Sequence, residues 1–208
     1  MTKSDHTEEE ENKSSELIVF PNMDPDSKSR TLLVYGEVDE ESSKGVIAGL
    51  YYYRDTGAAE ILEDSNPEDS GLPVDFIVST EGGSVTDMFA VYDCMREVRE
   101  SCDIHTFGVG KVMSAGILLL AGGTKGKRKV GRNCRLMLHA VSGGHYGSLK
   151  ELEVDIREVR WYQTQFAKAL SKETKMDEKE IRALFRKKTD TYFDADQALK
   201  WGIVDEVV

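Results

Sequence analysis

The sequence predicts an α/β protein with a mainly parallel sheet, and two observations support this fold class. Segments with the pattern of buried strands alternate with segments of helical periodicity, as in parallel strands joined by right-handed crossovers. No internal repeat or linker divides the 208 residues, a length that one compact domain can fill. We therefore expect a mobile acidic tail at residues 1–16, followed by a single domain over residues 17–208.

The first half of the chain contains two strand–helix units. Residues 31–38 (TLLVYGEV) have the composition of a buried strand, and residues 42–53 follow with helical spacing. Residues 63–71, with Pro67 and several acidic side chains, predict an acidic loop. A second strand is expected at residues 74–79, where the glycines that follow stop it, and the next helix begins near Val85.

The middle of the chain predicts a buried centre. Residues 104–109 form a third expected strand, and residues 113–121 are apolar on all sides, as in a short helix enclosed by the protein. Residues 135–139 (RLMLH) predict a further strand, followed by a flexible turn at residues 142–144.

Three helices are expected after this turn. The longest is amphipathic and runs from about Leu149 to Ser171. Asp177 caps the start of a second helix that ends near Lys188. Asp194 caps the third helix, which Gly202 terminates.

Charge and cysteine content exclude several classes of function. The formal net charge is −11, and residues 1–16 and 63–69 carry most of the excess, so no basic surface for nucleic acid is expected. The longest apolar run, residues 112–123, is shorter than the roughly 20 residues of a membrane span. Cys94, Cys102 and Cys134 have no CxxC spacing, which favours a reducing, cytoplasmic compartment and argues against a structural zinc site.

Ser114 is a candidate nucleophile because it follows a strand and opens the apolar helix at residues 113–121. The free N–H groups and positive dipole end of a helix N-terminus would stabilise an anion that develops there. Serine is also a preferred N-cap residue, and a simple cap is the favoured interpretation of Ser114 taken alone.

His139 is a candidate general base at the end of the 135–139 strand. For a lone histidine, a structural role remains the better interpretation. Among the other histidines, His6 falls in the tail and His105 inside a strand, which leaves His145 in the glycine-rich turn as the competitor.

Gly82 and Gly83 follow the second strand, where paired glycines let backbone N–H groups approach a ligand closely. The pair could equally form only a tight turn. Neither a GxGxxG motif nor a P-loop spacing is present, so no phosphate site is predicted.

Taken in order, these signals resemble one family, the caseinolytic ClpP serine peptidases. Residues 79–85 (STEGGSV) resemble the family's N-S-P-G-G-S-V turn, and residues 110–116 (GKVMSAG) resemble its G-x-A-A-S-M-G. The similarity continues to residue 208. It includes residues 122–128 (GGTKGKR), 133–139 (NCRLMLH), 189–193 (TDTYF) and 198–205 (ALKWGIVD). The match begins near residue 30, and the resemblance implies the ClpP/crotonase fold, a repeated β-α superhelix with a protruding handle helix.

The resemblance also implies roles for individual residues. Ser114 would be the nucleophile, His139 the base and Asp190 the carboxylate that orients His139, a role that rests on the resemblance alone. The N–H groups of Gly83 and Ala115 would form the oxyanion hole. Substrate would lie along the residues flanking the site, namely Gly82, Ser84, Ser142 and Gly143.

The family further implies assembly and partners. The long helix from Leu149 would be the handle, and the chain would form a heptameric ring, possibly a tetradecamer of two stacked rings. A Clp-type AAA+ ATPase would deliver unfolded polypeptide, since the 208 residues contain no Walker motif. No metal or other cofactor is expected.

Several positions depart from the family pattern. Glu81 replaces a proline beside the oxyanion turn, Ala115 replaces a methionine after the serine, and Thr189 replaces an arginine that supports contacts between rings. These departures keep a second hypothesis open, a catalytically impaired structural ring subunit. A third hypothesis is an acyl-coenzyme A enzyme of the crotonase fold, which would use glutamates and no Ser–His–Asp set.

Overall fold

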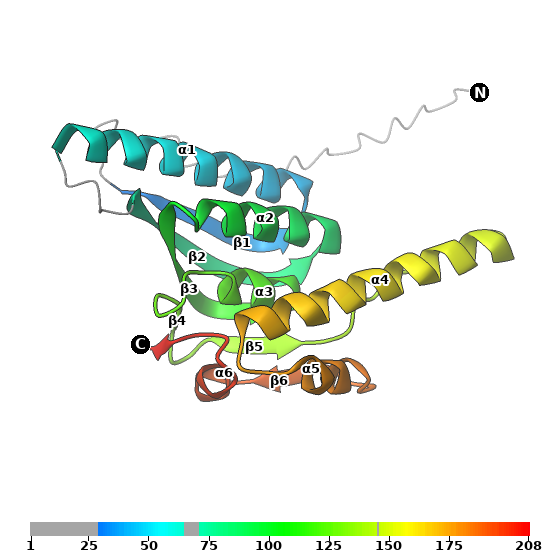
Figure 1. Ribbon diagram of the computed structural model, residues 1–208. Helices are drawn as coiled ribbons and strands as arrows, with labels where there is room; N and C mark the ends of the chain where they lie inside the picture. The colour runs from blue at the N-terminus through cyan, green and yellow to red at the C-terminus, as the bar shows by residue number, and fades with distance from the viewer. Residues whose placement is uncertain (1–28, 65–70, 145) are drawn as a thin grey trace, which may run out of the picture.

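The computed structural model describes residues 29–64, 71–144 and 146–208 (Figure 1). The predicted tail at residues 1–16, residues 65–70 of the predicted acidic loop, and His145 lie outside this part of the chain.

A mainly parallel sheet organises the described residues and confirms the predicted fold class. Five strands pair in the order β1-β2-β3-β4-β7, and β5 pairs with both β3 and β6. Every pairing is parallel except that of β5 with β6, which is antiparallel. The strands are β1 (Thr31–Val38), β2 (Gly71–Gly83), β3 (Cys102–Met113), β4 (Lys129–Val130), β5 (Arg135–Leu138), β6 (Thr191–Phe193) and β7 (Glu206–Val207).

Six helices are seen in the described part of the chain. They are α1 (Glu40–Asp64), α2 (Val85–Val98), α3 (Ala115–Ala121), α4 (Leu149–Glu173), α5 (Glu178–Phe185) and α6 (Ala195–Trp201). The predicted caps of α5 and α6 are present, because Asp177 and Asp194 each accept a hydrogen bond from a backbone N–H of the first helical turn, and Ser84 caps α2 in the same way. Gly202 ends α6 in the left-handed conformation, as predicted.

α1 is longer than the predicted helix at residues 42–53 and continues to Asp64. Thr56 and Gly57 give the sequence a break in helical periodicity, but the Arg30 side chain packs over this part of the helix. Its guanidinium donates to the carbonyl of Tyr53 and to Thr56 Oγ1, the latter at 3.2 Å. A tertiary contact therefore carries the helix through a segment of low propensity.

β2 and β3 also extend beyond their predicted ends, to Gly83 and Met113 respectively. Register shifts interrupt the pairing of both strands, and these bulges let glycine-containing segments remain in the sheet. β4, β6 and β7 were not predicted, since strands of two or three residues carry no measurable periodicity.

The core lies on one face of the sheet, under α1, α2 and α3 (Figure 1). Along β3, buried residues alternate with partly exposed ones, so only one face of the strand is covered. Every residue of α3 is buried, as its uniformly apolar sequence predicts. On the other face, register places the partly exposed side chains of Leu33, Ile77 and Phe107 side by side.

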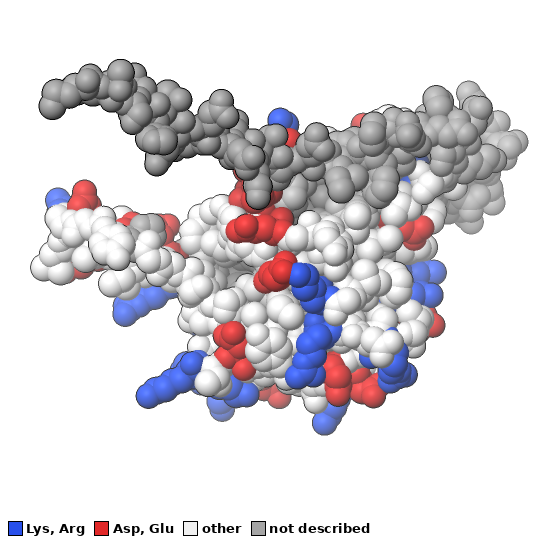
Figure 2. All heavy atoms as spheres, turned by 180° about the vertical axis from the view of Figure 1, so that it is seen from behind, with Lys and Arg blue, Asp and Glu red and all other residues white. Residues whose placement is uncertain are grey.

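α4 projects from the body and confirms the predicted protruding helix (Figure 1). Its C-terminal part is buried through Phe166, Ala167 and Leu170, whereas its N-terminal part exposes Leu149 and Ile156. The view from behind shows the same projection, with uncharged side chains over much of the middle of the body and charged ones gathered mainly below (Figure 2). None of the helices that the structure describes is long and apolar enough to cross a membrane.

Candidate active site

Strand pairing brings Ser114 and His139 together from separate parts of the chain. β3 ends at Met113 and β5 at Leu138, and the parallel register places Met113 beside Met137. The Ser114 N–H donates to the Met137 carbonyl at 2.8 Å, which continues the pairing beyond the strand. The residues directly after the two strands therefore meet at the same edge of the sheet.

The Ser114 side chain faces His139 rather than the helix that it precedes. Ser114 Oγ lies 2.8 Å from His139 Nε2. Although Ser114 stands at the N-cap position of α3, its hydroxyl makes no capping hydrogen bond. Its φ of 52° and ψ of −117° are rare for a residue with a side chain, and such strain is concentrated at functional sites. The geometry therefore contradicts the simple N-cap interpretation.

Asp190 reaches the same place through the short strand β6. Leu138 at the end of β5 pairs with Thr191 at the start of β6, and the antiparallel direction puts the residues just beyond them, His139 and Asp190, next to each other. His139 Nδ1 lies 3.6 Å from Asp190 Oδ1, which is an ion-pair distance and longer than a hydrogen bond. The two side chains are 30% and 47% exposed, so the cluster opens to solvent.

Gly82 and Gly83 form a turn that packs against the Ser114 segment. Both have positive φ values, 101° and 151°. A Cβ at Gly82 would lie 2.6 Å from Ser114 Cβ and 3.1 Å from Ala115 N, so only glycine allows this close approach. The Ala115 N–H belongs to the first residue of α3 and has no acceptor within the helix. The turn and this N–H thus flank the hydroxyl of Ser114.

Replacing Gly82 by alanine is expected to slow the reaction of Ser114 with a fluorophosphonate about 100-fold, because the new Cβ displaces the Ser114 turn. Gly126→Ala is the matched control, since Gly126 also has a positive φ, of 83°, but open space around its Cβ position. The thermal unfolding midpoints of both variants measure the loss of stability that alanine causes at a position with positive φ, which the two variants share. Equal reaction rates of Ser114 in the two variants would contradict the contact between Gly82 and Ser114.

Thr80 is a positioning residue that sequence reasoning missed. Its side chain is fully buried, donates a hydrogen bond to the Gly36 carbonyl and accepts the Gly82 N–H at 2.9 Å. This hydroxyl therefore holds the glycine turn from inside the protein. The available signal was the pair of hydroxyl residues, Ser79 and Thr80, at the end of a mostly apolar strand and shortly before the paired glycines.

The remaining predicted site residues lie around this cluster. Ser84 caps α2, with its hydroxyl accepting the Asp87 N–H at 3.3 Å. Ser142 and Gly143 are exposed in the segment after His139. Glu81 points to Lys111, with which it forms an ion pair. Within the described residues, no group of three or more His, Cys, Asp or Glu side chains could hold a metal ion.

Comparison with known proteins decides the family. Residues 22–208 match the family model for Clp protease. The chain belongs to the Clp protease family. One relative, the "ATP-dependent Clp protease proteolytic subunit 2" of Frankia casuarinae, is 32% identical over 189 residues, which cover 89% of this chain and 80% of the relative. Membership in this family confirms the resemblance drawn from the sequence motifs and supports a ClpP-type peptidase.

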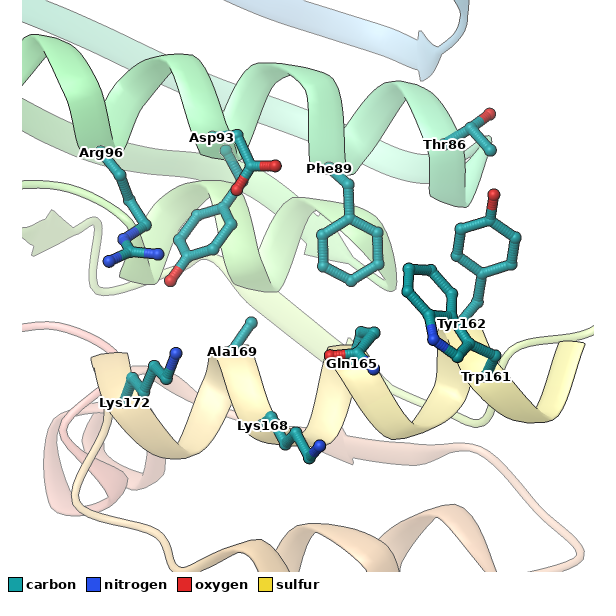
Figure 3. A pocket seen from close by; sticks show the side chains of 11 residues that line it. Thr86, Phe89, Asp93, Arg96, Trp161, Tyr162, Gln165, Lys168, Ala169 and Lys172 are labelled. Atoms are coloured by element: carbon teal, nitrogen blue, oxygen red, sulfur yellow. The ribbon is translucent and has the colours of Figure 1, made fainter. Parts of the chain in front are cut away.

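A separate groove of about 390 Å³ lies between α2 and α4 (Figure 3). Phe89 of α2 stacks on Tyr162 of α4 with ring centroids 6.3 Å apart, and Trp161 meets Tyr162 edge to face at 5.0 Å. Arg96 and Lys172 line the opposite end. The side chains of Ser114, His139 and Asp190 do not line this groove. The groove lies where the base of the projecting helix packs on the body of this Clp protease family member.

Proposed function

We propose that the protein is a serine endopeptidase subunit that hydrolyses peptide bonds of unfolded polypeptides inside a ring-shaped chamber. The observation that carries the proposal is the 2.8 Å contact between Ser114 Oγ and His139 Nε2. A nucleophile within hydrogen-bond reach of a base, with a third group that orients the base, is the arrangement that acyl transfer requires.

In the first half-reaction, His139 Nε2 takes the Ser114 proton as Oγ attacks the peptide carbonyl carbon. The Oγ–C bond forms, and the carbonyl electron pair moves to oxygen, where the N–H groups of Gly83 and Ala115 stabilise the negative charge. His139 then gives its proton to the leaving amine as the C–N bond breaks. Water repeats the sequence on the acyl-enzyme and frees Ser114.

Asp190 would keep the proton of neutral His139 on Nδ1, so that Nε2 is free to accept one. The 3.6 Å separation suits this role after a small closure, because catalytic hydrogen bonds are often long without substrate and tighten in the complex. An acidic side chain here also stabilises the imidazolium that forms during the reaction.

Substrate would bind as an extended strand between two backbone segments. Ser142 and Gly143 would form one side, directly after His139, and Gly82 and Ser84 would form the other, beside the oxyanion hole. Contacts to the substrate backbone carry affinity with little dependence on side chains, which suits a peptidase for unfolded chains.

Assembly and delivery of substrate require partners. The exposed apolar side chains of the projecting part of α4 and the uncovered face of the sheet support self-association into a heptameric ring, with a second ring stacked through α4. A Clp-type AAA+ ATPase would unfold and deliver substrate. The three unpaired cysteines, Cys94, Cys102 and Cys134, are in keeping with a reducing, cytoplasmic setting.

Peptide hydrolysis by the purified protein tests the proposal. We expect turnover of short fluorogenic peptides without ATP, and degradation of an unfolded protein only when a Clp ATPase and ATP are added. Turnover under neither condition, with a ring of normal mass, would instead favour the structural subunit that the departures at Glu81 and Ala115 keep open. Binding of coenzyme A without peptide turnover would favour a crotonase-type enzyme.

A further inference from the structure

Glu81 and Lys111 occupy irregular segments of neighbouring strands. On β1, Gly36 pairs with Thr80 and Glu37 with Gly82, so Glu81 is the extra residue of a bulge in β2. On β3, the pairing partner jumps from Gly108 to Val112, which places Lys111 in a second bulge. Bulges re-aim side chains and are frequent beside active sites.

Each bulge leads directly into one part of the candidate site. Glu81 precedes the Gly82–Gly83 turn, and Lys111 lies on β3 shortly before Ser114. The Lys111 ammonium donates a hydrogen bond to Glu81 Oε1, and the two side chains form an ion pair across the bulges. This hydrogen bond is the main cause that lowers the pKa of Glu81 below its ordinary value.

We propose that the Glu81–Lys111 ion pair is a positioning device that sets the distance between the oxyanion turn and the Ser114 turn. This inference rests on the proposed peptidase function. Thr80 holds the glycine turn on the buried side through the Gly82 N–H, and the ion pair holds it on the solvent side. Together they fix the turn from both directions.

The neighbouring cation is directed elsewhere. Lys111 pairs in register with Arg135 of β5, but the Arg135 guanidinium lies over the ring of Tyr192, 5.8 Å from its centroid. The ion pair with Glu81 is therefore the contact that directs the Lys111 side chain towards the bulge in β2.

Exposure separates this role from a contribution to stability. Glu81 and Lys111 are 59% and 37% exposed, and pairs this open to solvent add little to the free energy of unfolding. Catalysis is far more sensitive, because oxyanion donors act only within about 3 Å of the developing charge. Loss of the pair should consequently change the chemical step and leave folding intact.

Four variants test the proposal with a fluorogenic peptide: Glu81→Ala, Lys111→Met, the exchange Glu81→Lys with Lys111→Glu, and the control Glu206→Ala. The control removes a Lys–Glu pair of the same sheet, Lys129–Glu206 at 3.0 Å, with side chains 49% and 55% exposed. We expect each single variant at the site to lower kcat about tenfold with KM nearly unchanged, and the exchange to recover most of the loss. The control and the thermal unfolding midpoints should not change.

Three results would overturn the proposal. Single variants with the kcat of Glu206→Ala would show that the pair does not position the site. A rise in KM at constant kcat would instead assign Glu81 or Lys111 to direct substrate binding. An exchange variant with a kcat as low as that of the single variants would show that the ion pair itself does not position the site.

The labelling rate of Ser114 by a fluorophosphonate separates this inference from the function on which it rests. A wild-type protein that is not labelled would contradict both the proposed function and this inference. Labelled wild-type protein, with the same labelling rate in Glu81→Ala, would keep the peptidase and remove only the positioning role. A tenfold slower labelling rate in Glu81→Ala, restored by the exchange, supports both.

Discussion

Replacing Ser114 by alanine is expected to lower kcat for peptide hydrolysis by about 10⁴-fold or more, with the assembly unchanged. The loss is large because no other group can form the acyl-enzyme, and the oxyanion donors alone cannot replace that step. Ser114 lies directly before α3. Alanine removes only a hydroxyl that makes no capping hydrogen bond, so the fold should be retained. The kcat of the purified variant and its native mass measure both parts of this expectation.

Two further variants sharpen the Ser114 experiment. The double variant of Ser114→Ala with His139→Ala should lose little more activity than either single variant, since the two groups act as a unit. Ser101→Ala, which removes an exposed hydroxyl outside the site, should keep full activity. A loss below tenfold in Ser114→Ala would contradict the assignment of the nucleophile.

Replacing Glu173 by glutamine is expected to lower the free energy of unfolding by about 3–5 kcal/mol. Glu173 is the last residue of α4 and is only 4% exposed. Its carboxylate accepts hydrogen bonds from Tyr92 Oη at 2.8 Å and Arg99 at 3.0 Å, and Lys125 lies 3.3 Å away. A neutral amide would leave the largely buried Arg99 guanidinium without its counter-charge. Chemical denaturation of the two proteins measures the difference.

The effect of Glu173 should depend on pH. Burial pushes the pKa of this carboxyl upward, but the hydrogen bonds from Arg99 and Tyr92 outweigh it and leave the pKa below its ordinary value of 4.5. Because the folded pKa is depressed, the stabilisation is complete above pH 4.5 and is lost as the pH falls through the folded value. The gap between wild type and Glu173→Gln should therefore close in acid.

Glu178→Gln is the matched control for Glu173. Glu178 pairs with Arg182 at 2.6 Å, but the two side chains are 39% and 35% exposed, which is more than a third in each case. An exposed pair within one helix adds roughly 0.5 kcal/mol or less, so this variant should unfold almost as the wild type does. A constant difference between wild type and Glu173→Gln down to pH 3 would contradict the role of the ionised carboxylate.

The sequence was sufficient to predict the large elements of the fold. Strand–helix alternation gave β1 to α3 in order, and uniform apolarity correctly placed α3 in the core. It underestimated α1, β2 and β3, because an arginine contact and two bulges sustain these elements beyond the point where local propensity fails. Such tertiary effects are not visible in periodicity.

The candidate site was less accessible from composition and spacing. Ser114 alone favoured a cap and His139 alone a structural histidine, and only the sheet register shows why their side chains meet. Asp190 depended on the family resemblance, because the strand that carries it to His139 has only three residues. The ion pair between Glu81 and Lys111 could not be predicted, since the bulges that bring the two side chains together leave no pattern in the sequence.

The most direct test of the central claim is to react the intact protein with a fluorophosphonate and locate the modified residue by peptide mass spectrometry. The account predicts one adduct per subunit, on Ser114, and a greatly reduced labelling rate in His139→Ala, because the base that activates the hydroxyl is gone. An adduct on another residue, or an unmodified Ser114 in a folded wild-type assembly, would contradict it.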